Sequence, residues 1–277
     1  MKLTVITINY NNLPGLKKTF ESVFRQTSKE FEYIVIDGDS KDGSADEIAA
    51  HSDKIAYYVS EHDKGVYDAM NKGIKVATGD YCIFMNSGDC FYTTDVVEKV
   101  LPVLDSADII YGNTHYTDGK IRLSKDEPDL FSFFYVSCWC HQSTFIKTDL
   151  LKKYLYDDSL RIVADWKFLL QTVIKDNCTY KEIDQNISLY DATGISSTNK
   201  ELYDKERELV LKEMFTDRYI EDYQRMVYGY TWDEKLYIEM KNSKFHKLLY
   251  TVNVLLIRFL SCFKKGPAWI DKYPNTL

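Results

Sequence analysis

The stretch LTVITINYNN at residues 3–12 decides the fold class. Its first six residues are apolar or β-branched, which predicts a strand that is buried on both faces. The polar turn at residues 9–12 ends this strand. Pro14 suits a first helical turn, and apolar side chains then recur at helical spacing over residues 16–24. The chain therefore opens with a buried strand, a polar loop and an amphipathic helix.

The same alternation continues along the chain. It predicts strands at residues 33–36, 55–59, 81–85 and 107–112, helices at 66–77 and about 93–104, and extended segments at 142–147 and 179–190 around a helix at about 164–175. Such a pattern indicates a Rossmann-like α/β fold, a mostly parallel sheet with helices on both faces. Charged, tyrosine-rich helical patterns follow. We therefore expect a domain at residues 1–198 and a helical C-terminal region at residues 199–277.

The composition excludes several classes of protein. The 277 residues are 45% hydrophobic, so the chain can bury a full core. The formal net charge is −7, and no basic stripe crosses the first two hundred positions, so we expect no nucleic-acid partner. An acidic enzyme that handles phosphates usually needs a metal ion.

The cysteines and the apolar segments point to the cytoplasm. Six cysteines are scattered along the chain, and no signal peptide is predicted before them, so we interpret them as reduced thiols. The segment at residues 138–141, CWCH, has no second ligand pair after it, and zinc is not predicted. The charge-free apolar stretch at residues 248–257 is shorter than the roughly 20 residues of a membrane span.

Four polar loops follow four successive predicted strands, at residues 9–12, 37–44, 61–65 and 86–89. The carboxyl ends of parallel strands meet at one edge of a sheet, where ligands bind. Each loop alone is ordinary turn chemistry. The first loop lacks the glycine-rich fingerprint of a dinucleotide-binding oxidoreductase. Together the loops predict a ligand site of another kind.

The motifs around these loops resemble those of family 2 glycosyltransferases. They are VITINYN at residues 5–11, IVIDGDS at 34–40, DKGVYDAMNKG at 63–73 and YCIFMNSGDCF at 81–91. The resemblance covers about residues 2–190 and implies a GT-A fold. It further implies an inverting transfer from a nucleotide-diphosphate sugar, most commonly a UDP-sugar, to a saccharide or a lipid-linked saccharide.

The resemblance assigns the donor site residue by residue. Tyr10 stacks on the base, because a flat aromatic ring suits a base face. Asp37 and Asp39 accept hydrogen bonds from base and ribose, and Asp68 and Asn71 close the pocket. The full nucleotide-binding set is Thr7, Asn9, Tyr10, Asp37, Asp39, Asp63, Asp68, Asn71, Asn86 and Ser87.

The same resemblance implies a metal ion. Asp89 is the expected ligand of Mg²⁺ or Mn²⁺, which neutralises charge on the leaving diphosphate. Asn86 and Gly88 stand where many relatives have aspartates, so we expect modest metal affinity. Met70 stands where many relatives have an arginine that holds the nucleotide, which leaves thymine and guanine open beside uracil.

The catalytic candidates come from a later motif, IVADWKFLL at residues 162–170, which resembles the helix start that carries the general base in inverting members. Asp165 would take the proton of the acceptor hydroxyl. A simple helix cap is the alternative for this residue. His141 is a second catalytic candidate, although lone histidines are more often structural. Trp139 and Trp166 suit either an acceptor-sugar platform or core packing.

The C-terminal region contains a basic amphipathic helix near residues 245–265. Helical pitch places its apolar residues on one face, namely Leu248, Leu249, Val252, Leu255, Leu256, Phe259, Leu260 and Phe263, and its basic residues opposite, namely His246, Lys247, Arg258, Lys264 and Lys265. Such a helix can lie on an anionic membrane, which would suit a lipid-linked acceptor and a peripheral location on the inner face of the cell membrane. Packing on the catalytic domain or on a second subunit, as in a homo-oligomer, is the alternative.

Two other functions compete with sugar transfer. The altered metal motif and Met70 also suit a non-catalytic nucleotide-sugar-binding partner of another transferase. A nucleotidyltransferase is disfavoured, because no glycine- and lysine-rich triphosphate loop follows the first strand.

Overall fold

The computed structural model of the chain describes residues 2–124, 130–191, 199–228 and 232–261. Its strands are β1 (Leu3–Asn9), β2 (Phe31–Asp37), β3 (Tyr57–Ser60), β4 (Tyr81–Phe84), β5 (Cys90–Phe91), β6 (Ile109–Tyr116), β7 (Ile121–Arg122), β8 (Thr144–Lys147) and β9 (Tyr180–Tyr190). Its α-helices are α1 (Leu13–Phe24), α2 (Ser44–Ala50), α3 (Val66–Val76), α4 (Val96–Val100), α5 (Leu130–Val136), α6 (Thr148–Tyr154), α7 (Ala164–Leu169), α9 (Lys200–Met214), α10 (Asp217–Tyr228), α11 (Trp232–Asn242) and α12 (His246–Ser261).

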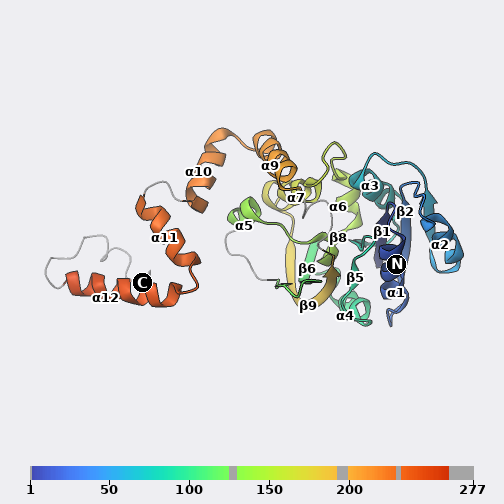
Figure 1. Ribbon diagram of the computed structural model, residues 1–277, viewed down its shortest axis with the longest axis horizontal. Helices are drawn as coiled ribbons and strands as arrows, with labels where there is room; N and C mark the ends of the chain where they lie inside the picture. Colours follow the sequence, from blue (N-terminus) through green and yellow to red (C-terminus); the bar gives the residue numbers. More distant parts are fainter. Residues whose placement is uncertain (1, 125–129, 192–198, 229–231, 262–277) are drawn as a thin grey trace. The chain divides into compact units, whose positions relative to one another are not determined.

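Within the described residues, the strands form one sheet in the order β3-β2-β1-β4-β8-β6-β9-β5, and β7 pairs with β6 (Figure 1). The four strands from β3 to β4 are parallel, and β6 is parallel to β9. The remaining pairs, among them β4 with β8 and β6 with β8, are antiparallel. The predicted mixed α/β fold with a mostly parallel central sheet and C-terminal helices is confirmed.

The first strand shows why the sheet needs helices on both faces. All seven of its residues are buried. Val5 belongs to a core cluster that also contains Leu16 and Phe20 of α1. On the opposite face, α3 approaches the sheet so closely that a Cβ atom at Gly73 would lie 2.6 Å from Ile6 Cγ2. Residues that alternate along β1 therefore pack against α1 on one face and α3 on the other.

Local signals explain where α1 begins. Asn12 caps the helix, since its Oδ1 accepts a hydrogen bond from the backbone N–H of Gly15 at 3.1 Å. Pro14 occupies the first turn, where a missing N–H does no harm. The loop after β1 is thus held at both ends, by the strand and by the helix cap.

Two predicted helices differ from the structure in detail. The predicted helix at residues 93–104 is a short α4 followed by a 3₁₀ turn at Leu101–Val103, which contains Pro102. The predicted helix at 164–175 is α7 followed by a π-helix at Leu170–Lys175. Wide helical turns of this kind are frequent at functional sites.

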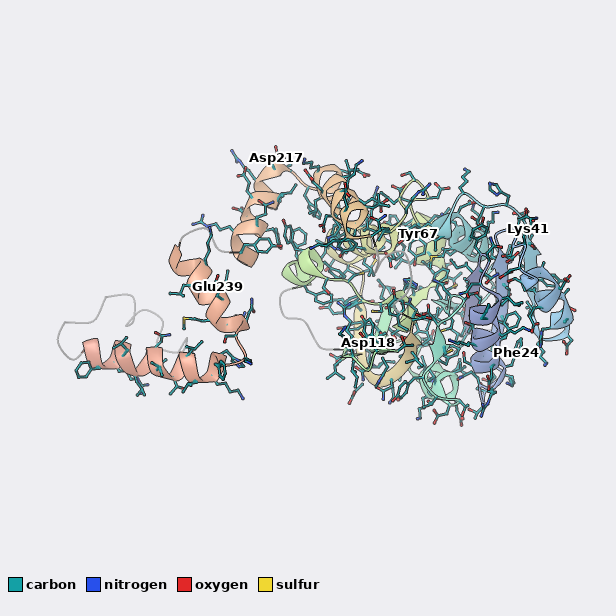
Figure 2. The ribbon with its side chains drawn as sticks, viewed as in Figure 1. Phe24, Lys41, Tyr67, Asp118, Asp217 and Glu239 are labelled. Atoms are coloured by element: carbon teal, nitrogen blue, oxygen red, sulfur yellow. The ribbon has the colours of Figure 1, made fainter. Side chains whose placement is uncertain are left out.

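The chain divides into two compact units, Met1–Met214 and Phe215–Leu277. The first unit contains α9, whose Glu206 and Arg207 are buried. Figure 2 shows the side chains around the sheet of this unit, among them Lys41 after β2 and Tyr67 in α3.

The second unit, taken by itself, contains α10, α11 and α12. Asn253 Nδ2 in α12 donates to Met240 Sδ in α11 at 3.6 Å. Several apolar side chains of α12 are exposed, namely Leu248, Val252, Leu255, Leu256 and Phe259. The predicted contributions of Phe263, Lys264 and Lys265 lie outside the described residues. Among the helices of the described ranges, none combines the length and the apolar character that crossing a bilayer requires.

Candidate active site

Hydrogen bonds tie the ends of the four parallel strands to one another. Asn9 Nδ2 donates to Asp37 Oδ1 at 2.7 Å, and Ser87 Oγ donates to Asn9 Oδ1 at 2.8 Å. Ser60, the last residue of β3, donates to Asp37 Oδ2 at 2.6 Å. The loops predicted to form one site therefore meet at one edge of the sheet.

Asp37 is the anchor of this network. Besides Asn9 and Ser60, it accepts from the Ser40 hydroxyl at 2.6 Å and from the Ser40 backbone N–H at 3.0 Å. Burial alone would raise the pKa of Asp37, but these donors hold it below its usual value. Four donors use the acceptor positions of one carboxylate, so Asp37 fixes the shape of the loops.

Tyr10 and Asp63 both lie close to Gly38. A Cβ atom at Gly38 would lie 2.5 Å from Asp63 Oδ2 and 3.1 Å from Tyr10 Cδ2, so a larger residue there would displace the Asp63 side chain. The Tyr10 side chain is 67% exposed, which leaves its ring accessible to a base. Burial raises the pKa of Asp63. Asp39 has a left-handed backbone, with φ of 65°, and pairs with Lys41.

Three other residues of the predicted nucleotide-binding set form hydrogen bonds within the protein. Thr7 is fully buried and donates to the Met85 carbonyl at 2.7 Å. Asn71 exchanges two hydrogen bonds of 2.8 Å with the backbone of Tyr156. Asp68 accepts from the Lys64 backbone N–H at 3.1 Å. These side chains therefore stabilise the loops, Thr7 from β1 and the other two from α3.

Asp89, the predicted metal ligand, is buried. Its Oδ1 accepts from the Asp191 backbone N–H at 3.0 Å, and its Oδ2 accepts from Gln142 Nε2 at 3.1 Å. Burial raises the pKa of Asp89 to about 6. The nearby Asn86 Oδ1 is buried, and no hydrogen bond reaches it from the residues that the structure describes.

These oxygens fit a weakly held divalent ion. Asn86 Oδ1 is an orphaned acceptor, and each Asp89 oxygen retains a second acceptor position. In the part of the chain that the structure describes, no three acidic, histidine or cysteine side chains come together as a metal cluster. Mg²⁺ in particular is often held by one or two protein oxygens together with substrate phosphates.

His141 connects this loop to the predicted base. Its Nδ1 lies 3.0 Å from Asp165 Oδ2, and its Nε2 lies 3.1 Å from Asn86 Nδ2. With Asp165 ionised, Nδ1 carries the proton and Nε2 accepts from Asn86. About a fifth of each side chain is accessible, 21% for His141 and 19% for Asp165. The two predicted catalytic residues are therefore in direct contact.

The second oxygen of Asp165 is held from α3 and from α7. Asp165 Oδ1 lies 2.9 Å from the Trp166 backbone N–H and 3.1 Å from the Tyr67 hydroxyl. The Tyr67 hydroxyl also lies 2.6 Å from the carbonyl oxygen of Ile162, so its single proton is shared between this oxygen and Asp165 Oδ1. Burial, with the adjacent Asp165, raises the pKa of Tyr67 well above its usual value. Tyr67 therefore stays a neutral donor.

Two residues that shape this site, Tyr67 and Glu206, had no role assigned from the sequence. Tyr67 lies inside the quoted motif at residues 63–73, so its position was available as a signal. Glu206 of α9 accepts from three successive backbone N–H groups, at Arg161 (2.8 Å), Ile162 (2.9 Å) and Val163 (3.3 Å). No sequence signal marked Glu206.

The two candidate platform tryptophans pack inside the protein. Trp166 is 2% exposed, and its Nε1 donates to the Phe134 carbonyl at 2.7 Å. The Arg207 guanidinium lies 3.8 Å from the centre of the Trp166 ring. Trp139 is 5% exposed and stacks on Tyr111 at 4.1 Å between ring centres. Trp166 thus joins α7 to α9.

Solved structures with this fold include transferases with bound nucleotides. Staphylococcus aureus TarS residues 1–349 in complex with UDP-GlcNAc matches with a TM-score of 0.61 at 16% identity, over 88% of this chain and 74% of that chain. The match to a longer TarS structure, with a TM-score of 0.62 at 16% identity, covers 89% of this chain but only 45% of that one. The mannosyltransferase PcManGT of Pyrobaculum calidifontis, in complex with GDP-Man and Mn²⁺, matches with a TM-score of 0.56 at 12% identity, over 96% and 88%.

Sequence relatives give a closer match. An uncharacterised glycosyltransferase of Mycobacterium tuberculosis is 33% identical over 204 residues, which cover 70% of this chain and 77% of the relative. A PGL/p-HBAD biosynthesis glycosyltransferase of Mycobacterium bovis is 28% identical over 172 residues, 60% of this chain and 67% of the relative. The model of the family described as "Glycosyl transferase family 2" matches residues 4–162. This chain therefore belongs to glycosyl transferase family 2.

Proposed function

We propose that this glycosyltransferase moves a sugar from a nucleotide-diphosphate sugar to an acceptor hydroxyl with inversion, and that Asp165 is the general base. The observation that carries the proposal is the link from Asp165 through His141 to Asn86. Asn86 belongs to the loop after β4, among the loops expected to hold the donor. This link supports a role for the Asp165 carboxylate beside the proposed donor site.

The chemistry follows from the acceptor positions of Asp165. Its Oδ1 already accepts from Tyr67 and Trp166, whereas His141 is the only donor at Oδ2 among the described residues. The remaining position on Oδ2 takes the proton of the acceptor hydroxyl. The acceptor oxygen then attacks the anomeric carbon, the bond to the diphosphate breaks, and the configuration inverts. His141 keeps the carboxylate in place during this step.

The loops at the carboxyl ends of the parallel strands bind the nucleotide sugar. The exposed Tyr10 ring stacks on the base, and Asp39 and Asp63 bind polar groups of the nucleoside. A UDP-sugar is the donor that we propose, supported by the UDP-GlcNAc complex of the similar TarS fold. Asp89 and Asn86 would hold Mg²⁺ or Mn²⁺ with the diphosphate, and the ion would supply positive charge to the leaving group.

Asp165→Asn tests the proposal. The variant keeps the shape of the side chain but removes its basicity, so transfer from a panel of UDP-sugars should fall by about 100-fold or more. UDP affinity, measured by calorimetry, should change little. Asp176→Asn, at the far end of the same helical segment, is the matched control and should retain activity. Full transfer by Asp165→Asn would contradict the base assignment, and UDP binding without turnover of any donor by the wild type would favour a non-catalytic binding partner.

The acceptor that we propose is a lipid-linked saccharide, approached from an anionic membrane surface by α12. The exposed apolar side chains of that helix and its basic residues Lys247 and Arg258 support this idea. In the full chain, Leu255→Glu combined with Phe259→Glu should abolish sedimentation with phosphatidylglycerol vesicles. Leu209→Glu, at an exposed apolar position of α9, should not. Equal vesicle binding by both variants would refute the membrane contact.

A further inference from the structure

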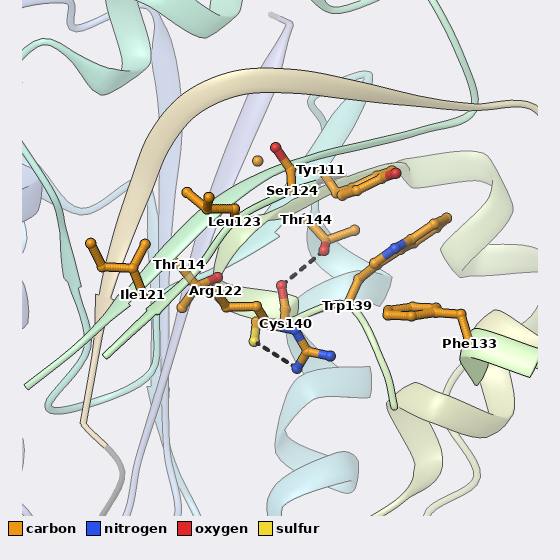
Figure 3. Close-up of a pocket in the computed structure, with 11 residues that line it drawn as sticks. Tyr111, Thr114, Ile121, Arg122, Leu123, Ser124, Phe133, Trp139, Cys140 and Thr144 are labelled. Atoms are coloured by element: carbon orange, nitrogen blue, oxygen red, sulfur yellow. Dashed lines mark hydrogen bonds between the residues drawn. The ribbon is translucent and has the colours of Figure 1, made fainter. Parts of the chain in front are cut away.

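A cavity of about 320 Å³ lies among β6, β7, β8 and α5 (Figure 3). Its walls include Arg122, Phe133, Trp139 and Cys140. Its volume lies within the range of pockets that hold small molecules, about 300–1,000 Å³. No residue assigned to nucleotide binding contributes to its described lining. The cavity is therefore separate from the donor loops.

Arg122 brings a positive charge into this wall without an acidic partner among the described residues. Its guanidinium donates to Ser137 Oγ and to Cys140 Sγ, the latter at 3.8 Å, and the Tyr116 hydroxyl lies close by. Glu182, which accepts from Ser124 in the wall at 3.3 Å, forms no ion pair with Arg122. A guanidinium has five N–H donors in a planar fork that matches a carboxylate or a phosphate.

Trp139 adds an indole ring to the wall of the cavity. The residue is 5% exposed, and its ring stacks on Tyr111 at 4.1 Å between ring centres. Phe133 and Tyr111 complete an aromatic wall, and such rings pack well on the C–H faces of sugars.

The cavity wall is continuous with the proposed catalytic segment. Cys140 immediately precedes His141 in the chain. Thr144 Oγ1 in the wall donates to the Cys140 carbonyl at 2.8 Å, and Thr114 Oγ1 donates to Ser143 Oγ at 2.8 Å. A group bound in the cavity therefore lies beside the segment that carries His141, the residue that bonds to the proposed base.

We propose that this cavity binds an anionic, sugar-sized group of the acceptor, a sugar that bears a carboxylate or a phosphate. Arg122 pairs with the anionic group, and the rings of Phe133 and Trp139 pack on the sugar. The assignment of this group to the acceptor rests on the proposed function, whereas the binding itself does not. The acceptor of this enzyme is accordingly a charged saccharide.

Binding can be observed through the indole N–H signals of the full-length protein labelled with ¹⁵N. The chain has four tryptophans. Glucuronate, glucose 6-phosphate and glucose are titrated separately at constant ionic strength. Glucuronate or glucose 6-phosphate should shift the Trp139 signal, and the more effective of the two identifies the anionic group. The Trp166 signal should stay in place, because its N–H is bonded to Phe134. Glucose should bind about tenfold more weakly or worse, because it lacks the charged partner of Arg122.

Arg122→Gln should weaken anionic-sugar binding by about tenfold or more. Arg25→Gln, at an exposed arginine that pairs with Glu21 on α1, is the matched control and should bind as the wild type does. If Arg122→Gln does not fold, the comparison of glucuronate with glucose on the wild type still decides. An equal response to glucose, or no Trp139 shift with either anionic sugar, overturns the proposal. UDP binding by the same sample tests the donor site separately, so a failure of one is distinguishable from a failure of the other.

Discussion

The two halves of the sheet are built differently. The half that contains β3, β2, β1 and β4 is parallel, and its polar loops follow its strands in simple succession. The half that contains β8, β6, β9 and β5 mixes parallel and antiparallel pairs, and β6 and β9 shift register near Asn113. The proposed donor site is therefore encoded by local sequence signals, whereas the proposed base and the cavity depend on segments that meet only after folding.

Side-chain contacts join the two halves at the loop after β4. His141 bonds to Asn86, and Gln142 bonds to Asp89. His141 and Gln142 both belong to the segment before β8, which pairs with β4. The junction between the halves is thus also the junction between the proposed donor loops and Asp165. Mutations on either side of it should separate folding from chemistry.

The largest effect on stability is expected from Glu206→Ala, which removes the carboxylate that holds the backbone segment before α7. Three backbone N–H groups before α7 would lose their acceptor, and the free energy of unfolding should fall by about 2–4 kcal/mol. Chemical denaturation measures the change. Glu208→Ala, on the same helix but exposed and paired only with Lys212, should stay within about 0.5 kcal/mol of the wild type. Equal losses in the two variants would show that α9 does not hold the Asp165 segment.

A smaller effect, of opposite sign, is expected from Asp89→Asn in the absence of metal and donor. The folded-state pKa of Asp89 is raised from 3.8 to about 6, so ionisation opposes folding as the pH rises through this window. At pH 8 the neutral variant should be more stable than the wild type, by on the order of 1–3 kcal/mol. At pH 4 the two should be nearly equal. Gln142 can reverse its amide to bond to the new side chain.

Denaturation at both pH values checks this prediction, and Asp95→Asn, at an exposed carboxylate paired with Lys99, should bring no gain. If Asp89→Asn is less stable than the wild type at pH 8, the buried Asp89 carboxylate does not destabilise the fold and the prediction is wrong. The same variant should lose any stabilisation by Mn²⁺ with UDP. Destabilisation by burial together with a functional loss is the pattern expected of an active-site carboxylate.

The sequence predicted the first half well because its signals are local. The run at residues 3–8 is a strand, and the motifs at residues 9–12 and 37–44 meet as expected, through Asn9 and Asp37. The contact of His141 with Asp165 spans 24 positions, and nothing in the spacing of the two residues specified it. Its existence depends on where β8 and α7 lie.

The missed features share this non-local character. Glu206 supports a backbone segment more than forty positions earlier in the chain. Arg122 and Cys140 line one cavity only because β7 pairs with β6 beside the segment before β8. Helical periodicity placed α9 but not the surface that it covers. Local patterns report strands, loops and motifs, and tertiary packing decides which side chains meet.

A calorimetric titration of UDP into the full-length protein, with and without Mn²⁺, tests the proposed donor site most directly. We expect binding at one site that Mn²⁺ strengthens, and an affinity for UDP about tenfold lower or worse in Tyr10→Ala, because the base loses its stacking partner. GDP and TDP in parallel identify the base. If none of the three diphosphates binds, with or without Mn²⁺, the loop edge is not a donor site and the proposed sugar transfer is contradicted.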